Sequence, residues 1–229
     1  MATLFIVGTP IGNLEDITLR AIRVLKEVHL ILCEDTRVTR KLLDHYEIKT
    51  PVESYHEHSD LSKTEKILSK IEAGENIALV TDAGTPGISD PGSKLVAIVR
   101  DRFEGGVKVE AIPGPSALTA ALSISGLDQS EFEFLGFLPH KKGRETIFKK
   151  IADSENAFVF YESPHRATKT LNSLAEHLSG ERKIFIAREL TKTFEESFLG
   201  TPKEALDYFT SHPDKIRGEF VIIVMPIKN

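Results

Sequence analysis

Residues that could bind or react with a ligand gather where apolar segments of the chain end. The clearest case is residues 80–92, VTDAGTPGISDPG, which directly follow the apolar run 76–80. Glycines allow a ligand to approach the backbone closely, and prolines hold a loop in one shape. The loop holds more glycine, proline and aspartate than a short connector requires, although a tight connector closed by an Asx turn is the alternative. We therefore predict a ligand-binding loop at 80–92.

Two further loops have the same character. Residues 8–14, GTPIGNL, follow the apolar segment 3–7, and residues 113–117, PGPSA, follow 107–112. The loop at 8–14 lacks the three-glycine spacing of a dinucleotide site and the Gly-Lys-Ser/Thr of a P-loop. Each loop alone could be a simple strand-to-helix turn. Their repetition after successive apolar segments favours one shared ligand site.

Charged clusters also follow apolar segments, and their side chains suit acid–base and phosphate chemistry. They are EDTR at 34–37, HKKGR at 140–144, YESPHR at 161–166 and ARELTK at 187–192. A carboxylate or an imidazole can accept a proton, and a guanidinium or an ammonium can hold a phosphate or polarise a hydroxyl. A solvated surface is the alternative for each cluster. The histidines and the cysteine lack the close spacing of a metal site, so no metal is predicted.

Short apolar runs alternate with amphipathic stretches along the chain, and this pattern predicts an α/β fold. Strands are expected at 3–7, 30–32, 52–55, 76–80, 107–112, 131–138, 157–161, 183–187 and 219–224. Helices are expected at 16–28, 38–46, 62–73, 93–103, 117–125, 144–153, 166–178 and 203–210, with Asp16 and Ser116 as N-caps.

A change of character near residues 125–128 predicts two domains, residues 1–117 and residues 118–229. The period-two alternation of 131–138, just after this change, indicates a half-exposed or an edge strand. In an α/β sheet the loops at the carboxyl ends of parallel strands border the ligand crevice. We therefore expect the glycine- and proline-rich loops to meet at one edge of a sheet.

The composition is that of an ordinary globular protein. The chain has 229 residues, of which 41% are hydrophobic and 28% are charged, and its net charge is −5. This charge argues against broad, nonspecific binding to nucleic acid but allows a local basic patch. Cys33 lies in an apolar run without a second cysteine to pair with, which fits core packing and a reducing compartment. No secretory leader and no apolar run near the ~20 residues of a membrane span are visible, so we expect a cytoplasmic protein that does not bind membranes.

Several motifs occur in an order that resembles a known family. They are GTPIGNL (8–14), EDTR (34–37), VTDAGTPGISDPG (80–92), IPGPSA (112–117), GFLPHKKGR (136–144), YESPHR (161–166), ARELTK (187–192) and GEF (218–220). In this order they resemble the tetrapyrrole methylase-like, or class III, S-adenosylmethionine-dependent methyltransferases, and among these the enzymes that methylate small-subunit ribosomal RNA. The likeness spans nearly the whole chain.

The resemblance implies two α/β domains of the tetrapyrrole methylase type, with S-adenosylmethionine in the cleft between them, and a homodimer. It implies transfer of a methyl group to the ribose 2′-hydroxyl of a cytidine in the decoding region of 16S ribosomal RNA. The partner would be that RNA or the small ribosomal subunit. By position, the cofactor contacts would be Pro10, Asp82, Ala83, Gly84, Thr85, Ile88, Ser116, Ala117, Tyr161, Ala187, Gly218 and Phe220.

Such a reaction needs a group that accepts the hydroxyl proton and cations that hold the RNA. The candidates for the proton acceptor are Glu162, Glu189 and His165. Arg188 and Lys192 are candidates to hold phosphate or to polarise the hydroxyl. The expected RNA contacts are Arg37, Arg40, Lys141, Lys142, Arg144 and Arg166.

Two other functions are open at this point. A corrin or sirohaem pathway methyltransferase would share the fold, but its glycine loop typically reads GGDPFxxGRG where this chain has GTPGISDPG at 84–92. The basic turn at 140–144 also suits a polyanion better than a small macrocycle. The other alternative is a noncatalytic RNA-binding protein of ribosome assembly, and the intact glycine- and proline-rich loops argue against it.

Overall fold

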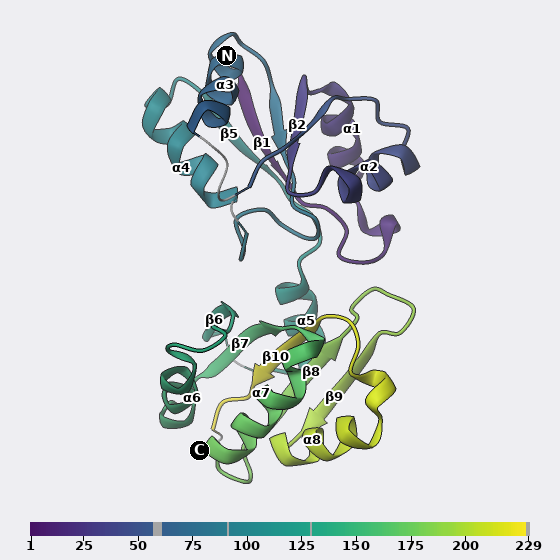
Figure 1. Ribbon diagram of the computed structural model, residues 1–229, viewed down its shortest axis with the longest axis vertical. Coiled ribbons are helices and arrows are strands. Elements are labelled where there is room, and N and C mark those ends of the chain that lie inside the picture. The colour runs from purple at the N-terminus through teal and green to yellow at the C-terminus, as the bar shows by residue number, and fades with distance from the viewer. Residues whose placement is uncertain (57–60, 91, 129, 228–229) are drawn as a thin grey trace. The chain divides into compact units, whose positions relative to one another are not determined.

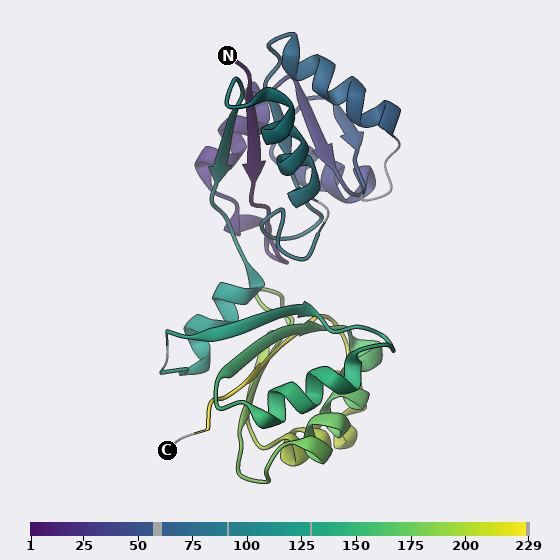
Figure 2. The same ribbon diagram turned by 90° about the vertical axis from the view of Figure 1, so that its left-hand side faces the viewer.

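The chain folds into two compact units, Met1–Ser116 and Ala117–Asn229. The computed structural model describes residues 1–56, 61–90, 92–128 and 130–227, so Pro91 of the loop at 80–92 lies outside the described residues. Each unit contains a β-sheet flanked by α-helices (Figure 1 and Figure 2), which confirms the predicted α/β class. Within the described ranges, no helix combines the length and the apolar character needed to cross a membrane.

The sheet of the first unit is parallel, and its described strands run in the order β3-β2-β4-β1-β5. The strands are β1 (Thr3–Val7), β2 (Leu30–Cys33), β3 (Val52–Ser54), β4 (Ile77–Leu79) and β5 (Lys108–Ile112). The helices are α1 (Leu19–Glu27), α2 (Thr36–His45), α3 (Leu61–Glu72) and α4 (Gly92–Phe103). Because the strands are parallel, their carboxyl ends share one edge, and the predicted ligand loops leave from that edge.

Alternate strand residues of the first unit enter two separate buried layers. Ile31 and Cys33 of β2 pack with α1 and α2, whereas Leu30 and Leu32 pack with α3 and α4. Both faces of the sheet are thus covered, which explains why these strands read as continuous apolar runs. Cys33 is fully buried, and burial raises the pKa of its thiol.

The second unit has a mixed sheet with the described strands in the order β6-β7-β10-β8-β9. β6 (Phe132–Phe137) runs parallel to β7 (Ala157–Glu162), whereas β8 (Ile184–Arg188), β9 (Glu196–Gly200) and β10 (Phe220–Val224) pair antiparallel with their neighbours. The helices are α5 (Ala117–Ser125), α6 (Arg144–Asp153), α7 (Pro164–His177) and α8 (Pro202–Ser211). β6 lies at an edge of the sheet, as its alternation predicted.

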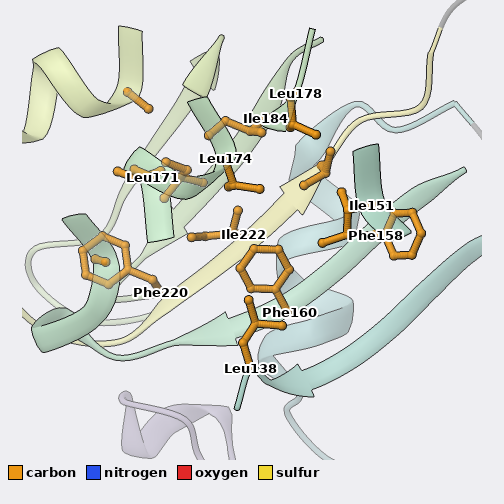
Figure 3. Packing of buried hydrophobic residues seen from close by; sticks show 14 of the residues in the cluster. Leu138, Ile151, Phe158, Phe160, Leu171, Leu174, Leu178, Ile184, Phe220 and Ile222 are labelled. Carbon is orange, nitrogen blue, oxygen red and sulfur yellow. The ribbon is translucent and has the colours of Figure 1, made fainter. Parts of the chain in front are cut away.

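Aromatic and branched side chains fill the layer between this sheet and its helices (Figure 3). Phe158 and Phe160 of β7 and Ile222 of β10 form a cluster with Leu171 and Leu174 of α7, and each of these side chains is at most 1% exposed. The three-residue spacing of the two leucines places both on one side of the helix. The apolar side of α7 and the apolar side chains of β7 and β10 therefore pack into one core.

Two local predictions were wrong. No strand was expected at the position of β9, but its residues pair along the whole of β8. Asp16 does not cap α1, since it ends a short 3-10 helix (Leu14–Asp16). Thr18 is the N-cap, and its side chain accepts a hydrogen bond from Ala21 N at 3.1 Å.

We predict that His177 of α7 makes the stability of the protein depend on pH. Its Nδ1 lies 2.8 Å from the carbonyl oxygen of Ser173, and its Nε2 lies 2.7 Å from a carboxylate oxygen of Glu145. Both neighbours are acceptors, so the backbone carbonyl and the carboxylate raise the pKa of His177 above its ordinary 6.5. The stabilisation is fully present below pH 6.5 and is lost as the pH rises through the raised native pKa.

Urea unfolding across this range should show the loss of free energy in the wild-type protein and not in His177→Gln. A wild-type unfolding free energy that stays level as the pH rises would contradict the prediction.

Candidate active site

The loops after β1 and β4 are joined at the carboxyl edge of the first sheet. Thr9 N donates a hydrogen bond to Gly84 O at 2.9 Å, and Gly84 N donates to Thr9 O at 3.1 Å. The Thr9 hydroxyl, in a residue that is 2% exposed, also donates to Thr81 O at 3.1 Å. Gly84 has a φ of +88°, which glycine adopts at little cost. This Thr9–Gly84 bridge fixes the glycine turn of residues 80–92.

The loop after β5 is packed against the same two loops. Gly8 N donates to Ile112 O at 3.0 Å, and the Thr85 hydroxyl donates to Pro115 O at 3.2 Å. Gly8 and Gly114 approach so closely that a Cβ on Gly8 would lie 2.8 Å from the backbone of Gly114. The glycine- and proline-rich loops predicted to share one ligand site therefore contact one another directly.

The charged loop after β2 joins this assembly through the Glu34 carboxylate and the Asp35 backbone N–H. Asp35 caps α2 by accepting a hydrogen bond from Arg37 N at 2.8 Å, and its own N–H donates to Asp82 Oδ1 at 3.0 Å. Glu34 accepts hydrogen bonds from the Thr81 hydroxyl and, at 3.4 Å, from Asp82 N. Hydrogen bonds from Arg37 lower the pKa of the Asp35 carboxyl to about 2. The Glu34 carboxylate and the Asp35 backbone N–H thus fasten this loop to the 80–92 loop, whereas the Asp35 carboxylate binds Arg37 of its own segment.

Asp90, which was not among the predicted site residues, holds the second half of the 80–92 loop. Its carboxylate accepts hydrogen bonds from the N–H groups of Gly87 and Gly92, each at 2.8 Å, and of Ile88 at 3.2 Å. Gly92 leaves room for this carboxylate, since a Cβ there would lie 2.8 Å from Asp90 Oδ1. The signal was present in the sequence, because aspartate favours the residues just before a helix.

The surface of these loops fits a ligand that carries both a positive charge and polar groups. Asp82 and Ala83 are exposed and Ile88 is 43% exposed, whereas Pro10 and Gly84 are buried. The Asp82 carboxylate favours a sulfonium or an ammonium, and the fixed backbone groups suit the polar atoms of a nucleoside. The residues present therefore fit S-adenosylmethionine. Of the other predicted contacts on this side, Thr85, Ser116 and Ala117 are half-buried.

Glu162, predicted as a proton acceptor, lies inside the second unit and is 0% exposed. Its Oε1 lies 2.7 Å from Arg166 Nε and accepts a hydrogen bond from Ser163 N at 2.8 Å. Its Oε2 lies 3.4 Å from Arg144 Nη2 and accepts a hydrogen bond from the Thr170 hydroxyl at 2.6 Å. Because both oxygens are occupied and shielded from solvent, this placement argues against Glu162 as the proton acceptor.

The two arginines beside Glu162 also differ from the prediction that they contact RNA. Arg144 is 6% exposed, and its Nη1 donates to Pro139 O at 3.2 Å. The side chain of Arg166 is 15% exposed, and its Nη1 donates to Leu138 O at 2.6 Å. Guanidinium groups used in this way hold the segment 138–144 in place, which argues against their direct contact with phosphates.

The remaining predicted RNA contacts are on the surface. Lys141, Lys142 and Arg40 are exposed. The side chain of Arg37 is 87% exposed, although it pairs with Asp35 at 2.6 Å. In the basic turn at 140–144, the Arg144 side chain is therefore buried and the two lysine side chains are exposed to solvent.

Glu189 and Lys192 form one cluster just after β8. Lys192 Nζ lies 2.7 Å from Glu189 Oε1 and 3.2 Å from Glu219 Oε2. Burial opposes the charged form of Lys192, but these two acidic partners outweigh it and raise its pKa. Glu189 has a φ of +52°, and a Cβ on Gly218 would lie only 2.0 Å from its Oε1. Gly218 therefore leaves room for the Glu189 carboxylate.

Arg188 and His165 differ sharply in exposure. Arg188 is 7% exposed and donates hydrogen bonds to Glu196 Oε2 at 3.2 Å and to Arg217 O at 3.3 Å. His165 is exposed in the first turn of α7. In this arrangement only His165 of the two is accessible to a large substrate.

The register of the second sheet brings several predicted contacts to one end. Phe220 of β10 lies opposite both Glu162 of β7 and Arg188 of β8, and the next residue lies opposite Tyr161 and Ala187. Phe220 and Ala187 have buried side chains, with Phe220 in the core of Figure 3, so only their backbone could contact a ligand. In the part of the chain that is described, no three His, Cys, Asp or Glu side chains are grouped as metal ligands.

Known proteins resemble this chain over most of its length. Residues 3–206 match the family described as Tetrapyrrole (Corrin/Porphyrin) Methylases. A "Ribosomal RNA small subunit methyltransferase I" of Synechocystis sp. is 48% identical over 98% of this chain and 79% of its own length. The proteins of the same name from Thermotoga maritima and Bacillus subtilis are 45% and 46% identical over 98% of this chain, which is 98% and 75% of their own lengths.

Solved structures share the fold at much lower identity. The methyltransferase CobJ has a TM-score of 0.69 and 19% identity, over 99% of this chain and 95% of that chain. Cobalt precorrin-4 methyltransferase, CbiF, has a TM-score of 0.68 and 15% identity, over 97% and 94%. At such identities the likeness concerns the fold alone.

We predict that Gly8→Ala separates the interlocked loops of the first unit. The new Cβ would lie 2.8 Å from Gly114 Cα and N, which are backbone atoms that cannot rotate away. The free energy of unfolding in urea should fall by about 1–3 kcal/mol. Gly180→Ala is the control, because no atom lies within 4 Å of the Cβ position there. Equal losses in the two variants would contradict the interlock.

We predict that Glu162→Gln acts on stability. The change leaves the buried Arg144 and the largely buried Arg166 without their counter-charge, and loss of one partner of a buried pair typically costs about 3–5 kcal/mol. The control is Glu133→Gln, which removes an exposed partner of Lys150 and should cost less than about 1 kcal/mol. Urea denaturation measures both losses, and a loss for Glu162→Gln no larger than that of the control would be inconsistent with the buried network.

Proposed function

The chain belongs to the tetrapyrrole methylase family, and we propose that it transfers a methyl group from S-adenosylmethionine to the ribose 2′-hydroxyl of a cytidine in the decoding region of 16S ribosomal RNA. The observation that carries this proposal is the likeness to relatives named ribosomal RNA small subunit methyltransferase I. These relatives are 44–48% identical over at least 96% of this chain.

In this proposal the loops of the first unit hold the methyl donor. S-adenosylmethionine, when bound, supplies a methyl group that its sulfonium has already activated. The Thr9–Gly84 bridge and the Asp90 carboxylate hold the loops in shape before binding, which reduces the entropy lost on binding. Rigid loops also orient what they bind, and orientation supplies much of the rate enhancement of many enzymes. The proposed contacts from the first unit are Pro10, Asp82, Ala83, Gly84, Thr85, Ile88 and Ser116. Those from the second unit are Ala117, Tyr161 and the backbone of Ala187, Gly218 and Phe220.

A ribose hydroxyl is a weak acid, so the chain has to accept its proton. We do not propose Glu162 as the proton acceptor, because it is buried and both of its carboxylate oxygens are paired. Glu189 Oε1 already accepts hydrogen bonds from Lys192 and from Glu219 N. His165 is exposed, so we favour its imidazole as the acceptor and keep Glu189 as the second candidate.

The exposed cations of the two units are the proposed contacts to RNA phosphates. They are Arg37, Arg40, Lys141 and Lys142. Arg144 and Arg166 contribute indirectly, because their hydrogen bonds hold the backbone that carries the two lysines. The proposal includes a homodimer that works in the cytoplasm, where its ribosomal substrate is found. It requires no metal, since the methyl group is activated by the donor itself.

A tetrapyrrole methyltransferase remains the second candidate, since solved enzymes of that kind share the fold. Those proteins are 14–19% identical to this chain, far below the ribosomal RNA methyltransferases. A noncatalytic RNA-binding protein would bind RNA without S-adenosylmethionine. Calorimetry with S-adenosylmethionine separates this last possibility from both enzymes.

The test is methyl transfer to small ribosomal subunits from a strain that lacks the modification. With S-adenosylmethionine carrying a labelled methyl group, the label should appear on the 2′-oxygen of one 16S cytidine, located by mass spectrometry of RNA fragments. Donor binding without label on the RNA would contradict the proposed substrate. Absence of donor binding would contradict the methyl transfer itself.

The same assay tests the proton acceptor. His165→Gln should lower turnover by about 100-fold or more while leaving the affinity for S-adenosylmethionine unchanged. Glu189→Gln is the matched comparison, and a larger loss of turnover in that variant would move the role to Glu189.

A further inference from the structure

An aromatic cluster lies where β6 and β7 end, outside the residues that the proposed reaction uses as acids or cations. Phe137 is 52% exposed, and its ring centroid lies 5.4 Å from that of Tyr161. The Phe134 ring lies 5.1 Å from Tyr161 on the same strand pair, and both contacts are close to edge-on, with interplanar angles of 71° and 60°. Phe137 and Tyr161 are also direct partners in the strand register. The three rings form one surface, which we call the aromatic platform.

The backbone of β6 directs these rings away from the core shown in Figure 3. Leu135 and Leu138 pack into that core, whereas Phe134 and Phe137 are not part of it. The register between β6 and β7 shifts between Phe134 and Phe137, and Gly136 there has a φ of +60°. Such a bulge re-aims side chains at the end of a strand, and here it leaves a large aromatic ring in solvent.

Positive charge follows the platform directly in the chain. Phe137 leads into Leu138 and Pro139, and the exposed Lys141 and Lys142 come next. The Leu138 carbonyl is held by the largely buried guanidinium of Arg166, and the Pro139 carbonyl by the buried guanidinium of Arg144. These contacts therefore hold the backbone that connects the exposed ring to the lysines.

We propose that Phe137, supported by Tyr161, stacks on an unpaired base of the RNA while Lys141 and Lys142 contact the neighbouring phosphates. An exposed ring beside cations is the combination that single-stranded nucleic acid requires, because each base offers a flat face and each nucleotide a negative charge. A second copy of this chain is a poorer occupant, since its own lysines would face the same positive charge. The inference rests on the proposed function and adds a base-stacking site to it.

The chain contains no tryptophan, which makes a direct test possible. Phe137→Trp places a single fluorescent indole on the platform, and Phe132→Trp, at the other end of β6 and 39% exposed, is the matched control. Protein-free 16S ribosomal RNA should quench the emission of Phe137→Trp and leave that of Phe132→Trp nearly unchanged. Equal responses of the two variants, or no response of Phe137→Trp, would overturn the inference. A change of emission that depends on protein concentration without RNA would also overturn it, in favour of a second copy.

Substitutions then separate stacking from apolar packing. Phe137→Ala and Phe137→Leu should each weaken RNA binding about tenfold, whereas Phe137→Tyr should bind as the wild type does. The affinity for S-adenosylmethionine, measured by calorimetry, should be unchanged in each. Wild-type affinity for RNA in Phe137→Leu would overturn stacking. If the wild-type protein methylates small subunits and Phe137→Ala does so with the same KM, only the stacking inference fails. If the wild type does not methylate them, the proposed function fails, and the fluorescence still reports on stacking.

Discussion

The bridge between Thr9 and Gly84 is the contact on which the ligand surface of the first unit depends. Loops rich in glycine have many accessible conformations, and holding them in one shape costs conformational entropy. Here contacts between the loops offset this entropy loss. They are the two backbone hydrogen bonds of the Thr9–Gly84 bridge, the hydrogen bond from the Thr9 hydroxyl, and the close packing of Gly8 against Gly114. Each loop restricts the conformations of the others, so the loops keep their shape without a ligand.

In the second unit a buried carboxylate connects segments of the chain, whereas in the first unit backbone hydrogen bonds between loops do so. Glu162 gathers Arg144, Arg166 and Thr170 around one carboxylate. Burying ions is costly, and a buried network of this kind is weak evidence for stability, but here it holds several segments in a defined geometry. The two guanidinium groups also donate hydrogen bonds to the Leu138 and Pro139 carbonyls. The network therefore holds the backbone between Phe137 and the exposed lysines.

In the proposed function the two units contribute mainly to different contacts, the first to the donor and the second to the RNA. A small donor with polar groups and a positive charge needs a rigid surface with fixed backbone groups and a carboxylate such as Asp82. A large polyanion needs exposed cations and flat apolar rings, and these are carried by β6 and the turn that follows it. The strained backbone of Glu189, tied to Lys192 and lying against Gly218, adds a third local constraint at the end of β8.

Most of the fold was predictable from the sequence, because apolar runs and helical spacing are local signals. The order of the elements, the α/β class and the concentration of glycine and proline after strands were determined in this way. β9 escaped prediction because the pairing partner that makes it a strand, β8, is supplied by the tertiary structure. The cap of α1 moved from Asp16 to Thr18 because a short 3-10 turn intervenes.

The direction in which each charged side chain points was decided only by the tertiary structure. In the sequence, Arg144 and Lys142 belong to one basic turn, and Glu162 and His165 to one polar motif. In the folded chain Arg144 and Glu162 are buried together, whereas Lys142 and His165 remain in solvent. The physical reason is that a charge is buried only where groups from other segments neutralise it or pair with it in hydrogen bonds, and residues 144, 162 and 170 meet only through the packing of α6 and α7 on the sheet. The sequence by itself therefore determined which chemistry the chain carries, and the packing decided which groups are free to use it.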